Sequence, residues 1–270
     1  MTLTEVRQHL AEFSIRPNKA LGQNFLIDGN IRHIILREAD VRRDETVLEI
    51  GPGLGMLTES LVERARHVVA IEKDRRLCAY LRERFCRVEL IEGDAVDVLG
   101  SPFPVPGSSF KVVSNLPYSV STPILERLVE GDLKPRRMVV TLQREVALRL
   151  AAKPRHKDYG ALTVFTQLRY HCTVAHVVSP GCFYPSPRVD SAIVVLDRRD
   201  PRVKLKPGAP FPEIVRAGFG HRRKTLKKLL AGRAHLDTAF AQVGIASTAR
   251  AEELGVEEWI ALANALQEAS

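Results

Sequence analysis

The sequence predicts an α/β fold, a parallel sheet with helices on both faces, followed by a small C-terminal helical domain. Between residues 46 and 142, short β-branched runs alternate with helix-like segments, which is the pattern of βαβ units. A proline-rich segment begins at residue 201, and the residues after it have helical periodicity. Such a segment is typical of a domain boundary, so we expect one large domain and one small domain.

The expected elements follow one another in order. Residues 46–50 are expected to form a strand, and residues 54–65 a helix with one buried face, because their apolar residues recur at helical spacing. Further strands are expected at residues 68–71, 88–91, 110–114 and 138–142, and further helices at residues 77–85 and 123–130. Residues 162–178 and 192–196 are expected to be strands with no helix between them, added in the antiparallel sense at the sheet edge.

The proline-rich segment separates the two expected domains. Four prolines and one glycine mark it: Pro201, Pro207, Pro210, Pro212 and Gly208. We expect the large domain at residues 1–200, with an N-terminal helical extension at residues 1–18, and the small domain at residues 201–270. Within the small domain, residues 221–230 and 257–266 are expected to form helices.

Length and composition are those of a globular protein. The chain has 270 residues, of which 45% are hydrophobic and 27% charged, and these values exclude disorder, collagen and coiled coil as the main state. No apolar run approaches the roughly 20 residues of a membrane helix, so we expect no membrane partner. Residues 1–13 carry Glu5, Arg7 and Glu12 and lack a long apolar centre, which makes them a poor signal peptide and a fair amphipathic helix.

The chain is basic, with 40 Lys and Arg against 32 Asp and Glu, a net charge of +8 and a pI near 9.5. Net charge indicates partners rather than fold, and a polyanion is the expected partner. Residues 216–233 contain seven basic side chains and no acidic one, and residues 153–157 form a second basic segment. The candidates for contacts with a phosphate backbone are Arg222, Arg223, Lys224, Lys227 and Lys228. A solvated helix face is the alternative interpretation of this cluster.

The four cysteines, Cys78, Cys86, Cys172 and Cys182, form no C-x-x-C pair. Structural zinc sites use cysteine pairs at short spacing, so no metal site is expected. Reduced thiols in a cytoplasmic protein are the expected state of these residues.

A glycine-rich turn follows the first strand of the predicted sheet. Gly51, Gly53 and Gly55 lie there, and glycine lets a ligand approach the backbone closely. In an open parallel sheet, a nucleotide-like ligand binds at this position. Met56 stands where a dinucleotide-binding loop would need its third glycine, which weighs against NAD. Many glycine turns bind nothing, so the turn alone is weak evidence.

Acidic residues follow the next two strands. Glu72 comes 21 positions after Gly51 and could accept hydrogen bonds from both hydroxyls of a ribose. Asp94 ends the following strand and could accept a hydrogen bond from the amino group of an adenine. Each acid alone is more often a surface charge. Because three successive strand ends meet at one edge of a parallel sheet, together they predict a crevice for a nucleoside.

The tetrapeptide Asn-Leu-Pro-Tyr at residues 115–118 ends another strand. An exocyclic aromatic amine is a poor nucleophile because its lone pair is delocalised into the ring. The side-chain carbonyl of Asn115 and a backbone carbonyl nearby could accept the two amine hydrogens, and Tyr118 could stack on the base. The alternative is an asparagine-containing turn with a buried tyrosine.

At these motifs the sequence resembles the class I S-adenosylmethionine-dependent methyltransferases and, more narrowly, the small-subunit ribosomal RNA adenine N6,N6-dimethyltransferase family. The resemblance covers nearly the whole chain. It begins at Lys-Ala-Leu-Gly-Gln-Asn-Phe-Leu, residues 19–26, and continues through the strand ends described above. Four later segments also match the family: residues 143–147, 183–191, 222–226 and 250–254.

The resemblance implies a Rossmann-like methyltransferase domain that binds S-adenosyl-L-methionine. The implied cofactor-binding residues are Asn24, Leu26, Gly51, Gly53, Glu72, Asp94 and Asn115. The implied catalytic residues are Asn115, Leu116, Pro117, Tyr118 and Phe183. Phe183 would form the second face of an aromatic sandwich around the target adenine, or it belongs to the core.

The resemblance also implies the reaction. Methyl groups would pass to the N6 amines of two adjacent adenosines in a hairpin near the 3′ end of 16S ribosomal RNA, giving N6,N6-dimethyladenosine. The expected partner is this RNA within a pre-30S particle during ribosome biogenesis, and a monomer is the default expectation. The basic cluster would dock the RNA through its phosphates.

Three alternatives remain open from the sequence. A related methyltransferase of the antibiotic-resistance type acts on large-subunit RNA, although Leu116 and the small domain favour the small subunit. A ribosome-assembly factor would use the same basic surface, with methylation incidental. A nucleotide-dependent oxidoreductase would share the glycine turn, but Met56 and residues 115–118 argue against it.

Overall fold

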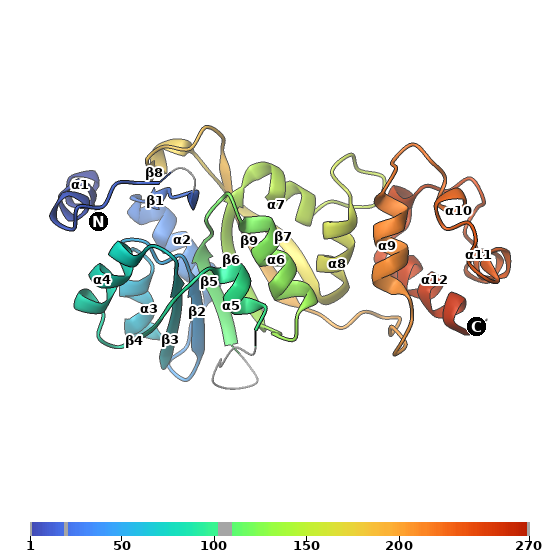
Figure 1. The fold of residues 1–270 in the computed structure, drawn as a ribbon, viewed down its shortest axis with the longest axis horizontal. Coiled ribbons are helices and arrows are strands. Elements are labelled where there is room, and N and C mark those ends of the chain that lie inside the picture. Colours follow the sequence, from blue (N-terminus) through green and yellow to red (C-terminus); the bar gives the residue numbers. More distant parts are fainter. Residues whose placement is uncertain (1, 19–20, 102–109, 269–270) are drawn as a thin grey trace. The chain divides into compact units, whose positions relative to one another are not determined.

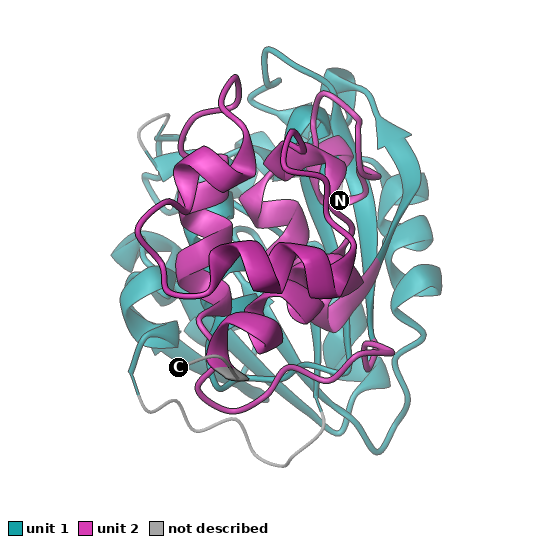
Figure 2. Ribbon diagram, turned by 90° about the vertical axis from the view of Figure 1, so that its right-hand side faces the viewer, with its two compact units in different colours: residues 1–147, 172–198 teal, residues 148–171, 199–270 magenta. Residues whose placement is uncertain are grey.

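The computed structural model describes residues 2–18, 21–101 and 110–268 (Figure 1). They divide into two compact units (Figure 2): unit 1 comprises residues 1–147 and 172–198, and unit 2 comprises residues 148–171 and 199–270. Within the described ranges, no helix has both the length and the apolar character that a membrane span requires.

Unit 1 is built on a seven-stranded sheet with the order β4-β3-β2-β5-β6-β9-β7. The strands are β2 (Thr46–Ile50), β3 (His67–Glu72), β4 (Val88–Glu92), β5 (Phe110–Asn115), β6 (Arg137–Gln143), β7 (Tyr170–Val178) and β9 (Ser191–Arg198). The pairs among β2 to β6 are parallel, and β9 pairs with β6 in the antiparallel sense. The predicted parallel sheet with an antiparallel addition is therefore confirmed.

Helices connect the strands, and a small second sheet pairs β1 (Phe25–Leu26) with β8 (Phe183–Tyr184). The first seven helices are α1 (Leu3–Glu12), α2 (Gly29–Ala39), α3 (Thr58–Arg64), α4 (Arg75–Arg84), α5 (Ala95–Leu99), α6 (Ser121–Glu130) and α7 (Arg144–Leu150). The later helices are α8 (Ala161–Arg169), α9 (Phe211–Phe219), α10 (Leu226–Leu229), α11 (Leu236–Val243) and α12 (Val256–Glu268), with short 3-10 turns at Pro180–Cys182 and Ala251–Glu253.

Two of the hydrophobic clusters in the described part of unit 1 involve helices α1, α2 and α3. In the larger one, Ile35 of α2 and Leu61 of α3 pack with Val113 of β5. In the smaller one, Val6 and Leu10 of α1 pack with apolar residues of α4, the glycine turn and β1. The amphipathic helix expected near the N-terminus therefore exists as α1, and its apolar face is buried within unit 1.

The strand expected at residues 162–178 is confirmed for residues 170–178, which form β7, and is wrong for residues 162–169, because these belong to α8. The N–H of Gly160 donates to Oγ1 of Thr163 at 3.1 Å where the helix begins, and Val164 and Phe165 are buried. The β-branched residues that suggested a strand here pack on a helix face instead, since β-propensity depends on tertiary context.

Two expected helices are shorter than their periodicity suggests. The helix expected at residues 54–65 begins only at Thr58, because the residues before it form the turns of the glycine-rich loop. The helix expected at residues 221–230 is limited to α10, because residues 221–225 form a turn in which the N–H of Lys224 donates to the carbonyl of His221 at 3.1 Å.

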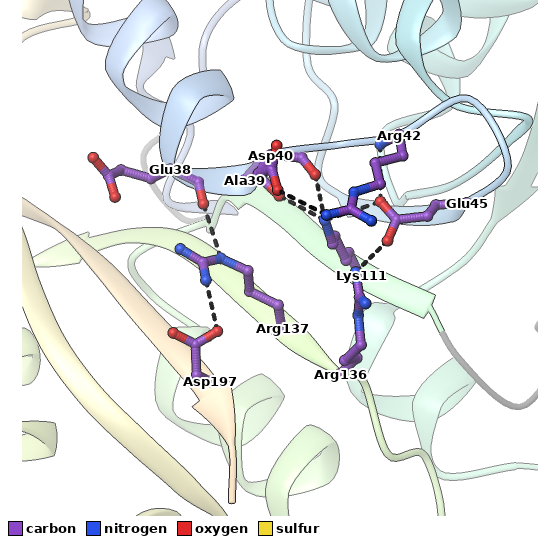
Figure 3. A network of polar contacts seen from close by, with 9 residues as sticks. All are labelled: Glu38, Ala39, Asp40, Arg42, Glu45, Lys111, Arg136, Arg137 and Asp197. Atoms are coloured by element: carbon purple, nitrogen blue, oxygen red, sulfur yellow. Dashed lines mark hydrogen bonds and ion pairs between the residues drawn. The ribbon is translucent and has the colours of Figure 1, made fainter.

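A buried lysine joins β5 to the end of α2 (Figure 3). The side chain of Lys111 is 2% exposed, and its Nζ donates to the carbonyls of Ala39 and Asp40 and pairs with Oε2 of Glu45 at 2.9 Å. Glu45 also pairs with Arg136. Every Nζ proton of Lys111 has a partner, and two partners are carbonyls at a helix C-terminus, where a cation is stabilised.

Unit 2 is helical and includes residues that the sequence places in the large domain. Tyr159 donates its hydroxyl hydrogen to the carbonyl of Leu254 at 2.9 Å, and the rings of Phe165 and Phe211 lie 6.1 Å apart. These contacts join residues 148–171 to the C-terminal helices. The compact unit therefore includes a segment before residue 200, because the aromatic side chains of that segment need the apolar surface of α9 and α12.

Candidate active site

The carboxyl ends of β2, β3 and β5 open into a pocket that lies within unit 1. Its walls carry both polar and apolar groups, and its mouth is open to solvent. All of the expected cofactor-binding residues line it: Asn24, Leu26, Gly51, Gly53, Glu72, Asp94 and Asn115. Leu116 and Pro117 line it as well, whereas Tyr118 and Phe183 are not among its lining residues.

The glycine-rich turn passes through this pocket in a conformation that requires glycine. Gly53 and Gly55 have φ values of +59° and +78°, which favour residues without a Cβ atom. A Cβ on Gly53 would lie 2.9 Å from the ring of Phe25, and one on Gly55 would lie 2.3 Å from the ring of Phe85. Larger side chains therefore cannot replace these two glycines, of which Gly53 lines the pocket.

Glu72 lies at the end of β3 with its carboxylate held by backbone. Its Oε1 accepts from the N–H groups of Lys73 at 2.8 Å and Asp74 at 2.9 Å, and its Oε2 accepts from that of Gly53 at 3.3 Å. The side chain is buried, and this desolvation raises the pKa of Glu72, with the three N–H donors opposing the rise. The carboxylate is rigid and retains acceptor capacity toward the pocket.

Asp94 caps the helix after β4. Its Oδ1 accepts from the N–H of Val96 at 2.9 Å, and its Oδ2 pairs with Nζ of Lys73 at 2.6 Å. The hydrogen bond from Lys73 is the main cause of the lowered pKa of Asp94, and the N–H of Val96 acts in the same direction. Asp94 is therefore an ionised acceptor at the rim of the pocket.

Glu49 is a pocket residue that the sequence reasoning missed. Its side chain is 2% exposed, and Oγ1 of Thr58 donates to its Oε2 at 2.7 Å. Burial raises the pKa of Glu49 to about 8, and the neighbouring charge of Glu72 adds to the rise. The available signal was a carboxylate within the otherwise uncharged strand residues 46–50, since such an acid is rarely buried without a reason.

Asn115 ends β5 with one amide atom bonded and the other free. Its Nδ2 donates to the main-chain carbonyl of Asn24 at 2.9 Å. Its Oδ1 is buried and, among the residues that the structure describes, has no hydrogen-bond partner. A buried acceptor without a donor costs free energy, so the pocket offers a place where a donor from a ligand would fit.

Tyr118 and Phe183 lie close together but do not face each other as two parallel plates. Their ring centroids are 6.2 Å apart with an interplanar angle of 74°. The hydroxyl of Tyr118 bonds to Oγ of Ser191, and burial raises the pKa of Tyr118 to about 12. Phe183 is 3% exposed. A flat ring could enter between the two faces only after one of these rings turns.

The five candidate RNA-contacting residues lie in unit 2, in the turn before α10 and within α10. Two of them have acidic partners, since Arg222 pairs with Glu252 at 3.1 Å and Lys227 pairs with Asp237 at 2.5 Å. Arg222 also donates to the main-chain carbonyl of Lys157 at 2.6 Å. The other three are exposed and have no ion pair within the described residues: Arg223, Lys224 and Lys228.

The sheet order, with the antiparallel strand β9 beside β6, and the pocket at the carboxyl ends of the parallel strands are those of a Rossmann-like methyltransferase. The family model for ribosomal RNA adenine dimethylases matches residues 15–268, and the chain belongs to this family. Among curated proteins, the "Ribosomal RNA small subunit methyltransferase A" of Clostridium botulinum is 39% identical over 256 residues, which cover 92% of this chain and 93% of that protein. The protein of the same name from Clostridium perfringens is 38% identical over 270 residues, covering 97% and 95%.

Solved structures agree with the fold. A dimethyladenosine transferase from Plasmodium falciparum superposes with a TM-score of 0.73 at 24% identity, over 88% of this chain and 95% of that one. The 23S rRNA methyltransferase ErmE superposes with a TM-score of 0.68 at 29% identity, over 90% of this chain and 100% of that one. The class I methyltransferase fold expected from the sequence is therefore confirmed.

Proposed function

We propose that this chain transfers methyl groups from S-adenosyl-L-methionine to the N6 amines of two adjacent adenosines in a hairpin near the 3′ end of 16S ribosomal RNA. The product is N6,N6-dimethyladenosine, made during biogenesis of the small subunit. The observation that carries the proposal is the buried Oδ1 of Asn115, which has no donor among the described residues and belongs to a residue that lines the same pocket as Glu72 and Asp94.

The donor set of the pocket fits this cofactor. The exposed backbone of the glycine turn would lie against it, Glu72 would accept from the ribose hydroxyls, and Asp94 would accept from the adenine amino group. Asn24 and Leu26 line the same pocket. When bound, S-adenosyl-L-methionine would supply a methyl carbon already activated by a positively charged sulfur.

The task of the protein side chains is alignment. Oδ1 of Asn115 would accept one hydrogen of the target amine, and a main-chain carbonyl of residues 115–117 would accept the other. The amine lone pair would then point out of the plane of the base. A neutral amide suits this task because it orients the amine without taking a full proton, and water can remove the proton after transfer. Positioning of this kind lowers a barrier by several kcal/mol.

The target adenine must leave its stack to reach the pocket, and aromatic side chains offset part of that cost. Tyr118 and Phe183 are the candidates, and their present edge-to-face contact requires that one ring turn when a base enters. The unpaired basic residues of unit 2 would contact RNA phosphates, with a pre-30S particle as the substrate and a monomer as the active form.

The small subunit is favoured over the large one by the relatives. The curated relatives at 38% to 40% identity that span more than nine-tenths of the chain carry the name of a small-subunit methyltransferase. The match to a 23S rRNA methyltransferase is weaker, at 29% identity. The reaction would therefore take place on 16S RNA.

The test is methyl transfer from radiolabelled S-adenosyl-L-methionine to undermethylated small and large subunits in parallel, followed by nucleoside analysis. We expect label only in the small subunit, in N6,N6-dimethyladenosine at two neighbouring positions. Label in large-subunit RNA, or a product that stops at one methyl group, would contradict the proposal.

A further inference from the structure

The orientation of the Asn115 amide depends on a main-chain carbonyl from the N-terminal segment. An asparagine side chain can fit one space in two ways by exchanging its nitrogen and oxygen. The carbonyl of Asn24 can only accept a hydrogen bond, and it lies 2.9 Å from Nδ2 of Asn115. This contact selects the orientation in which Oδ1 remains a free acceptor.

The position of that carbonyl depends on Gly22. The φ of Gly22 is +65°, and a Cβ there would lie 2.7 Å from Oγ of Ser119 and 2.8 Å from its backbone nitrogen. Residues 22–24 therefore lie directly against the turn that follows Asn115. Nδ2 of Asn24 donates back to the carbonyl of Gly22 at 3.1 Å, so the asparagine side chain closes this turn on itself.

Gln23 ties the same segment to the cofactor side of the pocket. Its Nε2 donates to Oδ2 of Asp74 at 3.1 Å, and its Oε1 accepts from the N–H of Asn18 at 2.8 Å. The N–H of Asp74 donates in turn to Oε1 of Glu72 at 2.9 Å. Hydrogen bonds thus connect Glu72 through Asp74 to the side chain of Gln23, and the next residue in the chain, Asn24, accepts the hydrogen bond from Asn115.

We propose that Gly22 and Gln23 are positioning residues for methyl transfer, holding the main-chain carbonyl of Asn24 where it orients the Asn115 amide toward the target amine. The inference rests on the proposed function and gives the main-chain carbonyl of Asn24 a task beside the cofactor binding expected of that residue. Because Gly22 and Gln23 act through Asn115, their loss lowers the rate of transfer more than the affinity for cofactor.

Gly22→Ala tests the inference, and Gly29→Ala is its matched control. The same methyl group is added in both, but a Cβ at Gly29 meets nothing within 4 Å. In the full-length chain, we expect Gly22→Ala to lower the single-turnover rate on undermethylated small subunits about 10- to 100-fold, the cost of an ångström-scale misplacement. The dissociation constant for S-adenosylhomocysteine, measured by calorimetry, should change less than about threefold, and Gly29→Ala should match the wild type.

Gln23→Ala and a double-mutant cycle give an independent readout. Gln23→Ala adds no atoms that could clash. If Gly22→Ala does not fold, the single-turnover rate and the S-adenosylhomocysteine affinity of Gln23→Ala test the inference instead. In an Asn115→Ala background, neither substitution should lower the rate further, since each acts through the Asn115 amide. A purely structural role would lower the rate equally in both backgrounds.

Three results would overturn the inference. The first is an equal rate for Gly22→Ala and Gly29→Ala. The second is a loss of S-adenosylhomocysteine affinity as large as the loss of rate, which would make residues 22–24 a cofactor lid. The third is additivity with Asn115→Ala. Failure of the proposed function is distinguishable from all three, because then the wild-type protein itself would transfer no methyl groups to small subunits.

Discussion

The two ends of strand β5 hold buried polar side chains in opposite ways. At its amino end, Lys111 has a partner for every proton of its Nζ (Figure 3). At its carboxyl end, Asn115 has a buried Oδ1 with no partner among the described residues. A paired buried group stabilises a fold, whereas an unpaired one costs free energy that a hydrogen-bond donor of a ligand would recover. The same strand therefore serves stability at one edge of the sheet and binding at the other.

Removal of the paired group should have the largest effect on stability. Lys111→Met leaves Glu45 with Arg136 and the N–H of Arg42 as its partners and leaves two helix carbonyls without their donor. We expect the free energy of unfolding to fall by about 3 kcal/mol, as when one partner of a buried pair is removed, measured by urea denaturation. The rate of methyl transfer per folded molecule should not change. A lower rate with unchanged stability would contradict the conclusion that Lys111 serves stability alone.

Removal of the unpaired Asn115 amide should lower the rate of methyl transfer and leave the stability nearly unchanged. Asn115→Ala is expected to lower methyl transfer about 100-fold, which corresponds to about 2.7 kcal/mol of barrier. Unfolding in urea should remain near the wild-type value, because only one hydrogen bond, to the carbonyl of Asn24, is lost. The affinity for S-adenosylhomocysteine should fall much less than the rate, because Glu72 and Asp94 remain in the pocket. Wild-type turnover in this variant would contradict the assignment of Asn115 as the residue that orients the target amine.

The buried carboxyl of Glu49 should make the stability of the fold depend on pH. Its pKa is about 8 in the folded protein against an ordinary value of 4.5, so between these values the folded state holds a proton that the unfolded state releases. Below about pH 4.5 the ionisation of this group does not lower the free energy of unfolding. As pH rises from there toward 8, the free energy of unfolding falls by at most about 1.4 kcal/mol per pH unit. We expect Glu49→Gln to flatten that slope in urea denaturation followed from pH 5 to pH 8. An unchanged slope would show that another group causes the decline.

The same distinction between paired and unpaired groups applies to the basic cluster of unit 2, with a smaller effect. Arg223 is exposed and without an ion pair in the described part of the chain, whereas Arg222 is held by Glu252. We expect Arg223→Glu to weaken RNA binding and to reduce the salt slope by about 0.7 to 0.9, the value of one phosphate contact. Arg222→Glu should weaken RNA binding and also lower the stability of unit 2.

Titration of RNA binding at several salt concentrations checks this prediction. Arg202→Glu makes the same charge change outside the cluster and serves as the control. Equal slopes for Arg223→Glu and Arg202→Glu would show that only net charge matters, and unchanged affinity for the double variant of Arg222 and Arg223 at low and high salt would exclude the cluster as a contact surface.

Much of the sheet and the location of the site were predictable, because they depend on local pattern. Alternation of β-branched runs with helical periodicity indicated the parallel strands, and carboxyl ends of parallel strands necessarily share an edge. The errors have a different origin. Residues 162–169 form a helix because aromatic residues of unit 2 bury its apolar face, and no local propensity carries that information.

The site was predictable only in its list of residues. The sequence placed Glu72, Asp94 and Asn115 at one edge, and the structure places all three on one pocket. It did not indicate that Arg222 is occupied by Glu252, or that Tyr118 meets Phe183 edge to face. Those contacts join residues far apart in the chain, and their geometry follows from how the elements pack.

The fold class, the family and the order of the motifs along the sheet could be read from the sequence, since these follow from periodicity and from residue types at strand ends. Tertiary structure alone decided which buried polar atoms have partners. Lys111 is saturated, the carboxyl of Glu49 is desolvated, and Asn115 keeps one free acceptor. The reason is that desolvation and hydrogen bonding depend on atoms brought together by folding, and one-dimensional spacing does not specify their distances.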